Sequence, residues 1–143
     1  MAAHDQNDAR GSARVLALTA KKCLDETYEP SKHRSTLNSL YRLLEAYRSH
    51  GFLGFEYEPR APRGPEALTL LPRAERNVAD LRLAFDRAFE EVYRERERGE
   101  AVQLVENVLK SIVYPGKVSV KRLDRERASA FLKNFVDNLY PVR

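Results

Sequence analysis

The chain has 143 residues, of which 43% are hydrophobic and 32% are charged. This length fits one compact domain, and the apolar content is enough for a core, which excludes a chain disordered throughout. No stretch approaches the roughly 20 uninterrupted apolar residues that span a membrane. The single cysteine, Cys23, excludes an internal disulfide framework and a zinc site with several thiolate ligands.

The charge balance is mildly basic. Lys and Arg number 25, Asp and Glu number 21, and the net charge is +4. This balance permits a nucleic-acid partner without requiring one. Arg outnumbers Lys, and its guanidinium forms bidentate contacts with phosphates and carboxylates. A GC-rich genome would produce the same excess of Arg, so composition alone assigns no function.

Residues 1–12 contain no apolar run that resembles a secretory signal and no face that a core could bury. We therefore expect a flexible tail at residues 1–12 and a single helical domain at residues 13–143. The lack of an export signal and the lone thiol predict a cytoplasmic protein with no membrane contact.

Two helices are predicted first. One runs from Ser12 to Glu26, with Ser12 as its N-cap. Its apolar positions are Val15, Leu16, Leu18, Thr19, Cys23 and Leu24. The second starts at Pro30, since proline fits a first helical turn, although Ser31 or Ser35 could also cap it, and it ends at His50 and Gly51. Its apolar side chains recur at three- and four-residue steps, at Leu37, Leu40, Tyr41, Leu44 and Tyr47.

The pattern then changes. Phe55 and Tyr57 alternate with glutamates, which predicts a short strand, and residues 66–71 (EALTLL) predict another. Proline and glycine residues between them break regular structure. We therefore predict a β-hairpin at about residues 52–71 with a long tip.

Helical periodicity returns from Arg73 and gives the longest predicted helix, followed by a break at Gly99. The alternating Arg and Glu residues at 94–98 predict a solvated surface on which the charges pair with one another. Residues 101–113 predict a very apolar helix in the middle of the core, stopped by Pro115 and Gly116.

Residues 117–122 predict a basic loop or a brief extended run. Asp124 is the predicted N-cap of the last helix, which Tyr140 and Pro141 end. The fold class is therefore mainly α: a small bundle of about five helices with one β-hairpin inserted after the second. Short links between neighbouring helices favour antiparallel packing.

The sequence lacks recognisable catalytic motifs. The glycines do not form a phosphate-binding or dinucleotide-binding loop, and G-x-S-x-G is absent. His33 and His50 lie roughly 25 Å apart along the second helix at 1.5 Å per residue, so they cannot share a metal. Cys23 lies on an apolar stripe, which favours a buried thiol over a nucleophile. We therefore expect a non-catalytic protein with no cofactor and no metal.

Residues 31–72 carry a connected pattern. The helix SKHRSTLNSLYRLLEAYRSHG is followed by FLGFEYE, an arginine-bearing tip PRAPRGP, the strand-like EALTLLP and a long helix. This pattern resembles the recognition helix and wing of winged-helix DNA-binding domains, particularly the MarR-type regulators. The resemblance implies that the start of the second helix faces the major groove or its flanking phosphates and that the tip reaches an adjacent phosphate or the minor groove. The residues so implied are Ser31, Lys32, His33, Arg34, Ser35, Thr36 and Asn38 in the helix and Arg60 and Arg63 in the tip.

A second basic cluster surrounds the start of the last helix. It consists of Lys117, Lys121, Arg122, Arg125 and Arg127, interrupted by Asp124 and Glu126. It would extend one continuous basic face if it lay beside the first cluster, which is formed by Lys21, Lys22, Lys32 and Arg34.

Two functions remain open. One is a nucleic-acid-binding accessory or regulatory subunit that uses a basic face and the hairpin, with DNA and RNA undistinguished. The alternative is a protein–protein interaction or adaptor subunit, or a homo-oligomer, since Tyr and Arg are enriched at interface hot spots. A single basic face would favour the first, whereas basic residues scattered and paired with Glu would favour the second.

Overall fold

The computed structural model describes residues 9–50 and 75–140. These residues form one short 3-10 turn and five α-helices. In chain order the elements are α1 (Ala9–Leu24), the 3-10 turn η2 (Pro30–Lys32), α2 (Arg34–His50), α3 (Glu75–Val92), α4 (Arg98–Val113) and α5 (Arg122–Asp137). A mainly helical bundle is thus confirmed. The predicted hairpin at 52–71 lies outside the described residues, and so do Arg60 and Arg63. Within the described ranges, no helix is long and apolar enough to cross a membrane.

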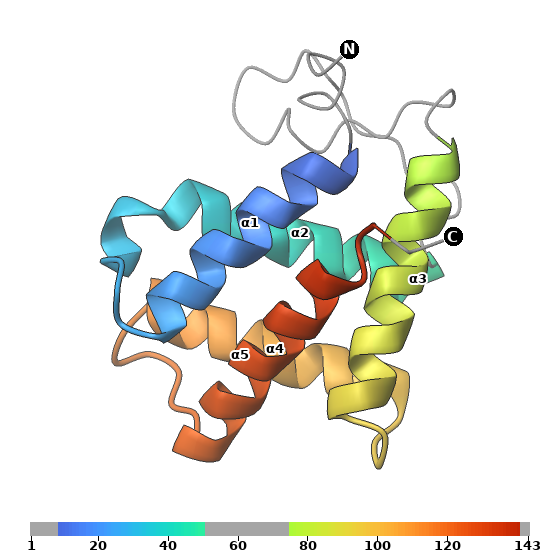
Figure 1. Cartoon of the computed structure of the whole chain (residues 1–143). Coiled ribbons are helices and arrows are strands. Elements are labelled where there is room, and N and C mark those ends of the chain that lie inside the picture. The colour runs from blue at the N-terminus through green and yellow to red at the C-terminus, as the bar shows by residue number, and fades with distance from the viewer. Residues whose placement is uncertain (1–8, 51–74, 141–143) are drawn as a thin grey trace.

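The helices pack as antiparallel neighbours. Figure 1 shows α1 and α5 lying across the front of the bundle, with α2 and α4 running behind them and α3 at one side. The Arg125 guanidinium, near the start of α5, donates a hydrogen bond of 3.2 Å to the carbonyl of Leu24, the last residue of α1. In the other layer, Arg48 near the end of α2 contacts Glu106 in the middle of α4. Tyr41, earlier in α2, contacts Lys110, which lies later in α4. Both pairs therefore run in opposite directions.

Aromatic rings form the centre of the core between α3 and α5. Phe85 stacks on Phe135 with ring centroids 4.2 Å apart, and Phe89 packs on Phe131 at 4.3 Å. Tyr47 of α2 closes the cluster, 4.9 Å from Phe85. These side chains are buried almost completely, so each contributes a large apolar area in addition to the ring contacts. This cluster joins α2, α3 and α5.

The buried face of α1 differs from the predicted one. Its members include the small side chains of Ala13, Ala17 and Ala20, which are fully buried, whereas Val15 is 58% exposed. The alanines recur at helical spacing and allow neighbouring helices to approach α1 closely. Hydrophobicity ranked Val15 above the alanines, but helical geometry places it on the opposite face. The helix also begins at Ala9, so residues 9–12 belong to α1 rather than to a tail.

Several predicted helix boundaries are wrong by a few residues. Pro30 starts a 3-10 turn, and α2 proper starts at Arg34. The break before α4 falls between Val92 and Arg98, so Gly99 lies within the first turn of α4 rather than marking the break. Asp124 is not the N-cap of α5; Lys121 occupies that position.

The displaced boundaries have a common physical origin. A cap contributes only about 1 kcal/mol, which packing of a long apolar face can override. Asp124 instead lies in the first turn of α5, where its negative charge suits the positive end of the helix dipole. The last helix ends at Asp137, three residues before Tyr140, the expected end.

Candidate functional site

Four segments meet at one end of the bundle, at the left of Figure 1. They are the end of α1, η2 with the start of α2, the end of α4, and the start of α5. Antiparallel packing of α1 with α5 and of α2 with α4 brings them together, and η2 also contacts α4. We call this region the basic end, and its cations are Lys21, Lys22, Lys32, Arg34, Lys117, Lys121, Arg122 and Arg125. The fold thus brings the two basic clusters of the sequence to the same end.

Some cations of the basic end are neutralised locally. The Lys21 ammonium lies 2.7 Å from the Asp25 carboxylate, and this hydrogen bond lowers the pKa of Asp25. Arg122 lies 3.3 Å from Glu126, although its side chain is 91% exposed. Exposed pairs of this kind are worth little, and a competing phosphate can displace them.

Lys22 is engaged with the Tyr28 ring and Arg125 with the Leu24 carbonyl, whereas the side chains of four other cations of the basic end make no ion pair, hydrogen bond or ring contact with any described residue. Lys32 and Arg34 flank the start of α2, and Lys117 and Lys121 lie in the loop between α4 and α5. All four are exposed to solvent. We call them the free cations. They are available to bind an anionic ligand, because no carboxylate of the described residues is paired with them.

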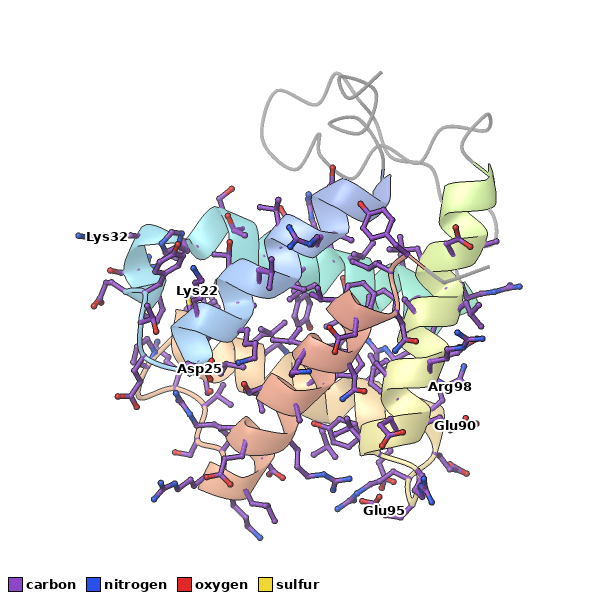
Figure 2. The ribbon with its side chains drawn as sticks, viewed as in Figure 1. Lys22, Asp25, Lys32, Glu90, Glu95 and Arg98 are labelled. Carbon is purple, nitrogen blue, oxygen red and sulfur yellow. The ribbon has the colours of Figure 1, made fainter. Side chains whose placement is uncertain are left out.

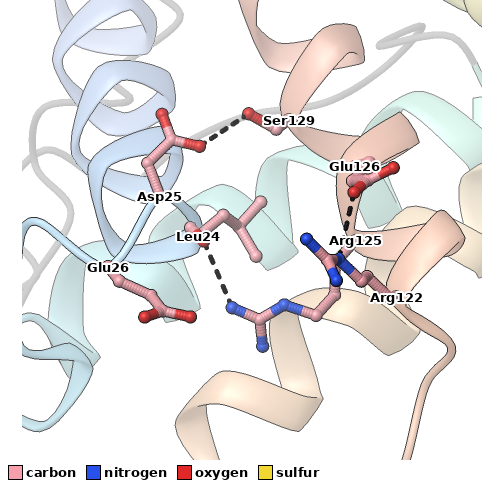
Figure 3. A pocket seen from close by; sticks show the side chains of 7 residues that line it. All are labelled: Leu24, Asp25, Glu26, Arg122, Arg125, Glu126 and Ser129. Atoms are coloured by element: carbon pink, nitrogen blue, oxygen red, sulfur yellow. Dashed lines mark hydrogen bonds and ion pairs between the residues drawn. The ribbon is translucent and has the colours of Figure 1, made fainter.

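A cleft of about 550 Å³ lies between the end of α1 and the start of α5, and Figure 3 shows the side chains that line it. Arg125 covers the Leu24 carbonyl, which would otherwise be one of the unsatisfied groups at a helix end. The Ser129 hydroxyl donates a hydrogen bond of 3.0 Å to Asp25. The carboxylates of Asp25, Glu26 and Glu126 outnumber the two arginines in the lining. The cleft is therefore a poor anion pocket, and a phosphate chain would be held outside it.

The end of α1 contains an unusual backbone conformation. Glu26 has φ of 64°, in the left-handed region that favours glycine. The Thr27 amide donates to the Lys22 carbonyl at 2.8 Å, which is the long-range bond of a Schellman motif. A glutamate thus occupies the position where glycine is usual, and its side chain lines the cleft.

The start of α2 presents most of the residues that the winged-helix resemblance implies. Ser31, Lys32, Arg34, Ser35 and Asn38 are exposed, whereas His33 and Thr36 are half-buried. The His33 ring stacks on Tyr28 with centroids 4.8 Å apart, and Lys22 lies 5.1 Å from the same tyrosine ring. His33 therefore serves partly to fix the turn before α2. Because the wing lies outside the described residues, the resemblance itself stays a prediction.

Arg127 does not join the basic end. Its guanidinium donates to the Val92 carbonyl, pairs with Glu95 at 2.8 Å and lies over the Tyr93 ring. The hydrogen bond that Arg127 donates to Glu95 lowers the pKa of Glu95 and raises that of Arg127. Arg125 and Arg127 are two residues apart, about 200° around a helix, so they point to different sides.

Several cations at the opposite end of the bundle pair with carboxylates. Figure 2 shows Glu90, Glu95 and Arg98 there, far from Lys22 and Lys32. Arg98 lies 2.9 Å from Asp86, and Arg96 lies within 4 Å of both Glu95 and Glu100. Within residues 94–98 only Arg96 and Glu95 pair with each other, so the predicted self-pairing of this segment is confirmed only in part. Arg96 and Arg98 are thus paired at this end, whereas the free cations at the basic end have no carboxylate partner among the described residues.

Two features of the described residues concern metal binding and thiol reactivity. No group of three His, Cys, Asp or Glu side chains lies close enough within this part of the chain to hold a metal ion. Cys23 is 2% exposed, and burial raises the pKa of its thiol, which opposes formation of a nucleophilic thiolate. The predicted buried thiol is confirmed.

Sequence reasoning did not place two exposed side chains at the basic end. Tyr114 follows α4 and is 50% exposed, and Leu123 in the first turn of α5 is 63% exposed. The available signal for Tyr114 was its position directly before Pro115 and Gly116, which predicts a turn and therefore exposure. Leu123 offered no signal beyond its position between charged residues.

No protein-family model, curated protein or solved structure matches this chain.

Proposed function

We propose that this protein is a non-catalytic nucleic-acid-binding subunit whose basic end contacts the phosphate backbone. The observation that carries the proposal is a group of four exposed cations at one end of the bundle. Lys32, Arg34, Lys117 and Lys121 are exposed without carboxylate partners in the described structure, although 21 acidic residues are available in the chain. At the opposite end Arg98 and Arg127, by contrast, are paired with such residues.

The mechanism is neutralisation of phosphates with release of condensed counterions. Lysine and arginine contacts of this kind position a protein on nucleic acid without reading its sequence. Arg34, Ser35 and Asn38 lie exposed on the first turns of α2, where they could add contacts to base edges. The sequence preference would therefore be modest and would come from α2.

A second candidate is a protein–protein adaptor subunit without nucleic-acid contact. Two observations favour it: Arg48, Arg96, Arg98, Arg127 and Lys133, all outside the basic end, pair with carboxylates, and the apolar side chain of Leu123 is exposed at the basic end. We rank the adaptor function second because it does not explain why the four free cations gather at one end.

The test uses the full chain and labelled single-stranded and duplex DNA and RNA, with binding followed by fluorescence anisotropy. In one variant the four free cations are replaced by glutamine. A matched control removes the same charge elsewhere, by replacing Arg14, Arg82, Arg87 and Arg94, which are exposed and carry no ion pair with a described residue.

We expect binding by the wild type and by the control, and loss of binding by the first variant. Equal losses in both variants would show a response to net charge alone and would contradict a basic-end site. If the wild type binds no nucleic acid at low salt, the proposal fails and the adaptor function takes its place.

A further inference from the structure

The connection between α4 and α5 begins with a rigid turn. The Lys117 amide donates a hydrogen bond of 3.1 Å to the Tyr114 carbonyl. Pro115 occupies the second position, and Gly116 occupies the third with φ of 87°. These features define a type II β-turn, in which proline presets one dihedral angle and only glycine adopts the other without strain. The turn is anchored to α4, because the Tyr114 amide donates to the Lys110 carbonyl at 2.8 Å.

This turn places an aromatic ring near a free cation. The first and fourth residues of a β-turn have Cα atoms less than about 7 Å apart, so Tyr114 and Lys117 are held as neighbours. The Tyr114 side chain is 50% exposed and makes no ring or cation contact with any described residue. Tyr28 and Tyr41, by contrast, are already covered by Lys22 and Lys110 respectively.

A nucleotide in a single strand matches this pair of groups. Its base can stack on an exposed aromatic ring while its phosphate meets a lysine, which is the usual arrangement in proteins that bind single strands. In a duplex the bases are stacked and paired internally, so the ring has no base to contact. The next cation along the loop, Lys121, would receive a following phosphate of the same strand.

Resting on the proposed function, we infer that the turn at residues 114–117 is a stacking platform that makes the basic end prefer single-stranded over duplex nucleic acid. Tyr114 supplies the preference for single strands, and the free cations supply affinity that both forms share. An acidic peptide would bind the cations without stacking on an aromatic ring. Its binding would therefore not depend on Tyr114.

The test compares Tyr114→Ala and Tyr114→Phe in the full chain, with a labelled single strand and the duplex of the same sequence. Tyr140→Ala is the matched control, because Tyr140 is another surface tyrosine, 45% exposed, beyond the far end of α5. Circular dichroism verifies that all variants are folded. We expect Tyr114→Ala to weaken single-strand binding by about tenfold or more while duplex binding stays unchanged. Tyr114→Phe and Tyr140→Ala should bind like the wild type.

An unchanged single-strand affinity in Tyr114→Ala would overturn the inference, as would an equal loss for the duplex. If Lys117→Gln weakens binding while Tyr114→Ala does not, the basic end stands and the stacking platform fails. If the wild type binds neither form, the proposed function itself fails. The two failures are therefore distinguishable.

Discussion

Glu106 is a buried carboxylate in the middle of α4, and its removal should stabilise the protein. Its side chain is fully buried, and neither of its oxygens accepts a hydrogen bond within the described structure. The nearest cation is Arg48, whose guanidinium lies 3.6 Å from Oε1 and is itself 36% exposed. A buried polar group without a hydrogen bond costs about 1–3 kcal/mol, and one partly solvated arginine offsets this only in part. We expect Glu106→Met, which keeps the length and helix propensity, to raise the free energy of unfolding by about 1–3 kcal/mol at neutral pH.

The gain should depend on pH in a definite direction. Burial raises the pKa of Glu106, with Glu45 adding to the rise, while Arg48 and Lys110 oppose it. Because the folded pKa exceeds the unfolded value, the wild type gains stability as pH falls from neutral through the folded pKa. The Glu106→Met variant lacks this gain, so the two stabilities should converge. Asp25 and Glu95 have lowered pKa values and act oppositely, but only as pH falls below their unfolded values of about 4.

Urea denaturation followed by far-ultraviolet circular dichroism measures these stabilities, since the chain contains no tryptophan. Measurements between about pH 7 and pH 5 isolate Glu106 from the ordinary carboxylates. The matched control is Glu100→Met on the same helix, where the side chain is 58% exposed and the change should stay within about 0.5 kcal/mol. The reasoning is refuted if Glu106→Met is less stable than the wild type at neutral pH, or if their pH profiles run parallel.

Two further substitutions test the fold. Glu26→Gly should raise the free energy of unfolding by about 0.5–1 kcal/mol, because glycine adopts φ of 64° without strain. Glu26→Ala should not raise it. Equal stability of the two variants would contradict the left-handed cap. Phe131→Ala should lower the free energy of unfolding by about 3–5 kcal/mol, because this ring is fully buried and packs on Phe89 with centroids 4.3 Å apart. Leu123→Ala, at an exposed position, should change it by less than about 0.5 kcal/mol; comparable losses in both variants would show that the aromatic cluster is not the core. Urea denaturation measures each.

Periodicity in the sequence was enough to locate the helices with large apolar residues. Leu40 and Leu44 in α2 and Phe85 and Phe89 in α3 are buried as their spacing predicted. The pattern failed in α1, where alanines form the contact face and Val15 is exposed. Small side chains carry little hydrophobic signal, yet they determine how closely helices approach.

The candidate site was predictable in its parts but not in its assembly. Both basic clusters are visible in the sequence, and the divergence of Arg125 from Arg127 follows from helical geometry. The two basic clusters meet at one end because α1 packs against α5, and the local sequence pattern contains no signal for that contact. Local spacing likewise could not show that Arg127 pairs with Glu95, 32 residues earlier.

The measurement that tests the basic end most directly is the salt dependence of single-strand binding. Each neutralised phosphate contributes about −0.7 to the slope of log affinity against log salt, so the four free cations predict a slope of about −3. The double variant Lys117→Gln, Lys121→Gln should reduce it to about −1.4 and weaken binding at low salt. An unchanged slope in that variant, or no binding by the wild type at about 50 mM salt, would contradict a phosphate-binding site at the basic end.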